Sequence, residues 1–110
     1  MSAATHIFDR LLEIAWAFEA DLARSFAGTA LTPSRTHLLW VLYHGGPSTQ
    51  RVLAESLSVS PRNVTGLVDA LAAAGYVERR PHPSDRRATL VTLTEFGTET
   101  MTEMARDREQ

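Results

Sequence analysis

The sequence predicts a mainly α-helical protein with one small β-hairpin, in the order α-α-α-α-β-β-α. Four segments carry helical apolar patterns or helix start signals, over residues 5–27, 32–45, 48–56 and 60–74. Residues 76–80 and 88–93 are short, rich in β-forming residues and roughly alternating, which indicates two strands. A last helical segment begins at Thr94. With 110 residues, the chain has the length of one domain.

Composition excludes several classes of function. The chain has no cysteine, which excludes disulfides, thiolate metal sites and thiol catalysis. No apolar run has the length of a membrane span, roughly 18 residues, and charged Asp9, Arg10 and Glu13 interrupt the segment where a signal peptide would be apolar. We therefore expect a cytoplasmic protein that neither spans nor binds a membrane. Four scattered histidines give no close ligand spacing, so we expect no metal site, with a carboxylate–histidine site across a dimer as the alternative. No sequence feature predicts a cofactor.

Charge is distributed unevenly along the chain. The net charge is −2, and every basic residue is arginine. Residues 35–87 hold seven arginines and four acidic residues, a net charge of +3, whereas residues 1–34 and 88–110 carry −2 and −3. A basic middle between acidic ends is expected if the middle contacts a polyanion. A mixed, solvent-exposed surface is the alternative.

The terminal helices have the properties of an association surface. In residues 5–27 the apolar residues form one helical stripe, made of Ile7, Leu11, Ile14, Phe18, Leu22 and Phe26. This face must pack on its own domain or on a second subunit. Residues 94–110 form a helix that reaches Gln110 without a stop signal. We expect the chain to form a homodimer through both segments, with the C-terminal helix cut short.

Residues 32–93 predict a winged helix-turn-helix. Cap-and-proline pairs start helices at Thr32 and Ser60, and a Ser48 cap starts the short helix between them. Within residues 50–69, Ala54 supplies the small residue at which the two helices cross, and Ser58 occupies the turn. The hairpin that follows is the wing, and two prolines are expected to keep its loop out of the strand ladder.

The helix after Ser60 is the predicted recognition helix. Its apolar residues Val64, Leu67, Val68 and Leu71 must face the core. The predicted DNA contacts on its outer face are Ser60, Arg62, Asn63, Thr65 and Gly66. Arginine suits guanine, asparagine suits adenine, and threonine suits a phosphate or a thymine methyl group. An interior glycine costs about 1 kcal/mol of helix stability, which close approach to DNA or to another helix would justify.

The wing supplies the second predicted contact. Arg86 at the loop tip is placed to enter the minor groove, and Arg79 and Arg80 at the base of the loop to meet phosphates. Arg87 is also expected to be a DNA-binding residue. Asp85 is expected to hold a neighbouring arginine through a charge-assisted hydrogen bond. A solvent-exposed charged hairpin without function is the alternative.

Residues 75–87 (GYVERRPHPSDRR), Leu90–Thr94 and Gly97 resemble the wing signature of the MarR family. This resemblance, over about residues 5–105, implies a homodimeric winged-helix transcriptional regulator, by default a repressor. It implies that Asp85 and Arg87 support the wing and that Arg86 is its tip. His82 replaces the acidic residue often found in the signature. Members usually continue through a longer fifth helix and a sixth, which complete the dimer.

The resemblance also implies a cleft for small aromatic effectors between the dimer region and the DNA-binding region. The matching residues are Trp16, His37, Trp40 and His44. The alternative, which we favour, is that both tryptophans belong to the core and both histidines are exposed or hydrogen-bonded within the protein. No nucleophile elbow or phosphate-binding loop is present, so we expect no enzymatic activity. A winged helix that binds protein would expose apolar residues on the recognition helix, and the polar face favours DNA.

Overall fold

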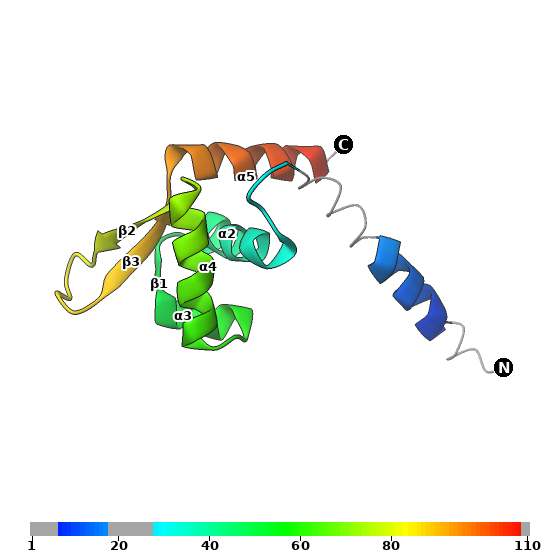
Figure 1. Cartoon of the computed structure of the whole chain (residues 1–110), viewed down its shortest axis with the longest axis horizontal. Coiled ribbons are helices and arrows are strands. Elements are labelled where there is room, and N and C mark those ends of the chain that lie inside the picture. The colour runs from blue at the N-terminus through cyan, green and yellow to red at the C-terminus, as the bar shows by residue number, and fades with distance from the viewer. Residues whose placement is uncertain (1–6, 18–27, 109–110) are drawn as a thin grey trace. The chain divides into compact units, whose positions relative to one another are not determined.

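The computed structural model describes residues 7–17 and 28–108, and of residue 108 only the backbone. The chain divides into two compact units, residues 1–33 and 34–110, which are described separately (Figure 1). In the first unit, residues 7–17 form a helix inside the predicted 5–27 segment. Its apolar stripe is exposed, because Ile7, Leu11 and Ile14 are 62%, 59% and 64% accessible. Phe18, Leu22 and Phe26 lie outside the described residues.

Four further helices confirm the predicted helical segments. They are α2 (Pro33–Gly45), α3 (Gln50–Leu57), α4 (Pro61–Ala73) and α5 (Glu95–Arg108). Ser60 caps α4 as predicted, accepting a hydrogen bond from the Asn63 N–H at 3.1 Å. The cap of α3 differs from the prediction: Thr49 accepts the bond from Val52 N, and Ser48 lies in a strand.

A three-stranded antiparallel sheet replaces the predicted two-stranded hairpin. Strands β2 (Val77–Pro81) and β3 (Thr89–Leu93) form the hairpin, and β1 (Ser48–Thr49) pairs with the other edge of β3. Two residues are too short to show the alternation that predicts a strand, so β1 was missed. Pro81 pairs with Thr89, so the prediction that both prolines stay outside the ladder was wrong. An edge strand accommodates proline because its outer N–H needs no partner.

The core of the second unit lies where α2, α3, α4 and α5 meet the sheet. Its fully buried side chains come from all of these elements and are Leu38, Leu39, Leu53, Val64, Val68, Leu71, Val91 and Met101. Leu67, which was expected to face the core, is half-buried. This packing fixes which side of α4 remains outside. In Figure 1 the β2–β3 hairpin extends away from the helices of this unit.

Candidate nucleic-acid interface

The turn between α3 and α4 sets the position of the predicted recognition helix. Ser58 adopts a left-handed conformation, with φ 55° and ψ 43°, and its N–H donates to the carbonyl of Glu55. The following residue, Val59, donates to the carbonyl of Ala54 at 3.1 Å. Ala54 is buried, as expected for the small residue at a helix crossing. The structure therefore confirms the predicted helix-turn-helix unit, with serine where glycine is commonest.

The outer face of α4 gathers all the residues predicted there. Val64, Val68 and Leu71 are fully buried on its inner face. Ser60, Arg62, Asn63, Thr65 and Gly66 are all exposed. Four of them, Ser60, Arg62, Asn63 and Gly66, line a shallow groove. Arg35 and Leu67 complete its lining. The helix thus presents one polar, glycine-containing strip to the outside.

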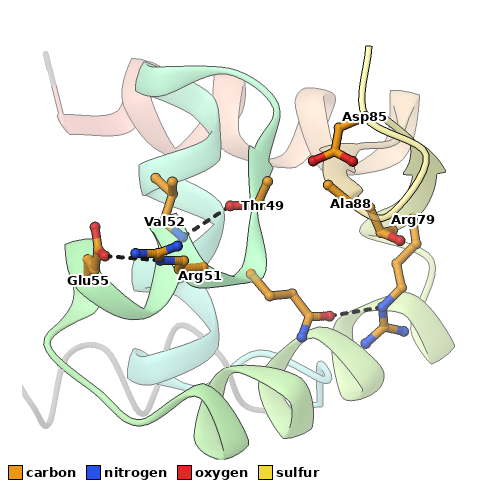
Figure 2. Close-up of a pocket in the computed structure, with 9 residues that line it drawn as sticks. Thr49, Arg51, Val52, Glu55, Arg79, Asp85 and Ala88 are labelled. Carbon is orange, nitrogen blue, oxygen red and sulfur yellow. Dashed lines mark hydrogen bonds and ion pairs between the residues drawn. The ribbon is translucent and has the colours of Figure 1, made fainter. Parts of the chain in front are cut away.

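Two of the wing arginines are held by carboxylates. The Arg79 guanidinium lies 2.6 Å from the Asp69 carboxylate on α4, and its Nε donates to Gln50 Oε1 on α3 at 3.1 Å. The dashed line at Arg79 in Figure 2 marks the second bond. Arg80 Nε donates to Glu78 Oε1 at 2.7 Å within the same strand. Both arginines were predicted to meet phosphates, and within the protein each has a carboxylate partner.

Sequence reasoning missed the polar network at the base of the wing. Gln50 accepts from Arg79 and donates from Nε2 to Thr65 Oγ1 at 3.0 Å, so it joins α3, α4 and β2. Asp69 is exposed on α4, and no residue near it in the sequence marks it as the partner of a wing arginine. A lone glutamine carries no recognisable signal. Asp69 on α4 and Arg79 on β2 can be recognised as an ion pair only when the strand is known to lie beside the helix.

The wing loop is shaped by backbone hydrogen bonds to two side chains. His82 Nδ1 accepts from the N–H groups of Ser84 and Asp85, each at 3.1 Å. Asp85 Oδ1 accepts from the Arg87 N–H at 2.9 Å. In the described part of the chain, Asp85 forms no ion pair with Arg86 or Arg87. The expected charge-assisted hydrogen bond to an arginine side chain is therefore replaced by a turn, in which Asp85 holds the backbone.

The arginines between residues 35 and 87 fall into separate classes. Arg51 lies 3.7 Å from Glu55, and Arg79 and Arg80 have the carboxylate partners described above. Arg62, Arg86 and Arg87 are exposed and make no ion pair among the residues that the structure describes. These three are on the outer face of α4 and at the wing tip. Their charges are therefore not neutralised within the described part of the chain.

A separate aromatic cluster lies on α2. The ring of His44 is edge-on to Trp40 at 4.4 Å and to Tyr43 at 5.3 Å between centroids. Tyr43 Oη lies 3.4 Å from Thr102 Oγ1 on α5. His37 and His44 are exposed and Trp40 is half-buried. Trp16, which is 63% accessible, belongs to the other compact unit.

No described helix is long and apolar enough to cross a membrane. Among the residues that the structure describes, no group of three or more histidine, aspartate or glutamate side chains is arranged to hold a metal ion.

The fold and the wing signature agree with a known family. The MarR family model matches residues 31–89. The chain belongs to the MarR family. It is 34% identical over 84 residues to the uncharacterised HTH-type transcriptional regulator YdgJ of Bacillus subtilis, covering 76% of this chain and 51% of YdgJ. It is 30% identical over 100 residues to the HTH-type transcriptional repressor YetL of the same species, covering 87% of this chain and 59% of YetL.

A solved structure supports the assignment to the MarR family. The transcriptional regulator Tm0710 of Thermotoga maritima has a TM-score of 0.75 and 33% identity, covering 94% of this chain and 74% of that protein. The winged-helix architecture is therefore that of MarR regulators. The chain spans about half the length of the curated relatives it matches.

Proposed function

We propose that the protein is a sequence-specific, double-stranded DNA-binding transcriptional regulator, with α4 in the major groove and the wing in the minor groove. The observation that carries the proposal is the position of the unpaired arginines. Arg62 on α4 and Arg86 and Arg87 at the wing tip have no carboxylate partner among the described residues. A surface for phosphates and base edges needs such free guanidinium groups.

Gly66 supports the same proposal. A Cβ atom added there would meet no atom of the described chain within 4 Å, so intramolecular packing does not require this glycine. In a helix interior it costs about 1 kcal/mol relative to alanine. Close approach of the helix backbone to DNA would offset that cost. In this proposal Arg62 and Asn63 contact bases, and Ser60 and Thr65 also contact the DNA in the major groove. Arg86 and Arg87 contact the DNA from the wing, in the minor groove.

The roles of the other wing residues follow from their contacts. Arg79 and Arg80 are exposed and can therefore reach phosphates. Their positive charges are partly neutralised by Asp69 and Glu78, which weakens their attraction to phosphate. We assign them a secondary part in DNA binding. Asp85 holds the wing turn through the Arg87 N–H and so orients the two tip arginines.

The active form in this proposal is a homodimer. The exposed stripe of Ile7, Leu11 and Ile14 on the N-terminal helix supports it, because three large apolar side chains on one helix face are stabilised by burial. A two-fold dimer would bind half-sites about one helical turn apart, roughly 34 Å. Like YetL, which is named a repressor, it would repress transcription, and it would act in the cytoplasm.

An effector is the last part of the proposal. The half-buried Trp40 and the exposed His44, whose rings are in contact on α2, are the residues assigned to a small aromatic ligand, whose binding would weaken DNA affinity. Titration with benzoate, a small anionic aromatic probe, tests it by tryptophan fluorescence. Quenching that survives Trp16→Phe and disappears in Trp40→Phe would support this site. Unchanged fluorescence in both variants would contradict it.

The experiment for the whole proposal is fluorescence anisotropy with a duplex from upstream of the protein's own coding sequence. A scrambled duplex of equal composition is the control, and both are measured at two salt concentrations. We expect tighter binding to the native duplex, with an affinity that falls steeply as salt rises because counterions are released. Binding to neither duplex by a chain of dimer mass would contradict the proposal and favour a winged helix that binds protein.

A further inference from the structure

Thr65 lies on the outer face of α4 with its hydroxyl group already engaged. Thr65 Oγ1 is 3.1 Å from the carbonyl oxygen of Pro61, one turn earlier in the helix. It is also 3.0 Å from Gln50 Nε2 on α3. A carbonyl oxygen only accepts, so the hydroxyl hydrogen of Thr65 points to Pro61.

The orientation of the Gln50 amide fixes the other half of this arrangement. Arg79 Nε carries a hydrogen and can only donate, so the amide oxygen of Gln50 must face it at 3.1 Å. The amide nitrogen then faces Thr65 and donates. Arg79 is itself held by Asp69 on α4 at 2.6 Å. Arg79 therefore donates both to Asp69 and to Gln50, and from Arg79 through Gln50 and Thr65 to the Pro61 carbonyl every hydrogen bond runs in the same direction.

The hydroxyl of Thr65 thus donates its only hydrogen to one group and accepts from another, which leaves its methyl group and one oxygen lone pair. A phosphate contact would need the hydroxyl hydrogen, which the Pro61 carbonyl takes. In the major groove, thymine is the base that presents a methyl group, and threonine packs against it through its own methyl.

We propose that Thr65 recognises thymine through a methyl–methyl contact, because Gln50 and the Pro61 carbonyl engage its hydroxyl group. This inference rests on the proposed function and names one of its base contacts. Thr65 is the specificity-determining residue, and Gln50 is a group that takes up its hydroxyl. Gln50 also joins α3 to the base of the wing, so the same amide relates the position of Thr65 to that of β2.

The test compares two duplexes of identical sequence from the upstream region. In the second duplex, deoxyuridine replaces every thymidine, which removes the 5-methyl groups and leaves base pairing intact. The full chain and the variants Thr65→Ser and Thr65→Val are measured on both by fluorescence anisotropy. Serine keeps the hydroxyl and loses the methyl group, whereas valine keeps the shape and loses the hydroxyl. Circular dichroism checks that both variants fold.

We expect the wild-type chain to bind the deoxyuridine duplex more weakly, by about fourfold for each half-site, the effect of one buried methyl group. Thr65→Ser should lose this fourfold difference in affinity between the thymidine and deoxyuridine duplexes, whereas Thr65→Val should keep it. Thymine contacts made by other residues contribute equally to all three proteins and cancel. A full difference in Thr65→Ser, or an equal loss in both variants, would overturn the inference. A wild-type chain that binds neither duplex would instead contradict the proposed function.

Discussion

Gly97 lies directly against the carbonyl group of Tyr76, and a Cβ atom at Gly97 would overlap that oxygen. Thr94 strengthens the same junction: its hydroxyl donates to the Gly75 carbonyl at 2.6 Å and accepts from the Gly97 N–H at 3.0 Å. The first turn of α5 is therefore held against the chain that enters β2. The position of the wing base relative to the C-terminal helix depends on this contact.

Gly97→Ala should destabilise the protein. The obstructing atom is backbone oxygen, which cannot rotate away as a side chain does, so α5 or β2 must shift. We expect a loss of about 1–3 kcal/mol in the free energy of unfolding, the usual cost of overpacking. Urea denaturation followed by circular dichroism measures it. An unchanged unfolding midpoint would show that the junction yields easily.

Gly66→Ala is the matched control and a prediction of its own. Nothing lies within 4 Å of the added methyl group, so we expect α4 to gain stability, about 1 kcal/mol in the same denaturation experiment. Duplex affinity should fall, because the proposed approach of the α4 backbone to DNA leaves no room for a Cβ atom. If the variant is more stable and binds the duplex with unchanged affinity, Gly66 does not lie at the DNA interface.

The sequence was sufficient to predict the helices and the recognition face, because these depend on local signals. Ser60 before Pro61 marks the start of α4, and buried Val64 and Val68 determine which side faces outward. Gly75, with φ 89°, ends the helical region where predicted. Cap residues, helical spacing and positive-φ glycines all act within a few residues of the chain.

The parts that were missed depend on contacts between distant residues. Strand β1 exists because Ser48 pairs with Val91, forty-three positions later, and two residues carry no pattern of their own. The ion pair of Arg79 with Asp69 likewise depends on the strand β2 lying beside α4. Asp85 was predicted to bind an arginine side chain. Its carboxylate instead accepts a hydrogen bond from the backbone N–H of Arg87, two residues later, as aspartate commonly does in turns.

Arg62→Ala should relax the base preference inside the half-site. Its guanidinium is exposed on α4 without an ion pair in the described part of the chain, so the proposed guanine contact is its main interaction. We expect a loss of about 1–3 kcal/mol on the native duplex and a smaller loss on the scrambled one. Arg51→Ala is the control, because Arg51 pairs with Glu55 on α3. Equal losses of Arg62→Ala on both duplexes would indicate a phosphate contact.

Arg86→Ala should weaken binding most on duplexes whose flanks are rich in A·T pairs. The narrow minor groove of such flanks has the more negative potential, which favours an inserted arginine. The expected loss is about 1–3 kcal/mol, together with a shallower salt dependence. Arg51→Ala serves as control again, because Arg51 pairs with Glu55 on α3. The same loss on G·C-rich flanks would contradict insertion into the minor groove.

Leu11→Lys should dissociate the proposed homodimer. Leu11 lies in the exposed apolar stripe of the N-terminal helix, and burying a leucine side chain contributes about 2 kcal/mol. A two-fold dimer contains two copies, so the dissociation constant should rise on the order of a hundredfold or more. Glu13→Lys places the same charge beside the stripe and is the control. Sedimentation equilibrium measures both variants. A wild-type chain that sediments as a monomer, or equal effects of the two substitutions, would show that this stripe is not the dimer contact.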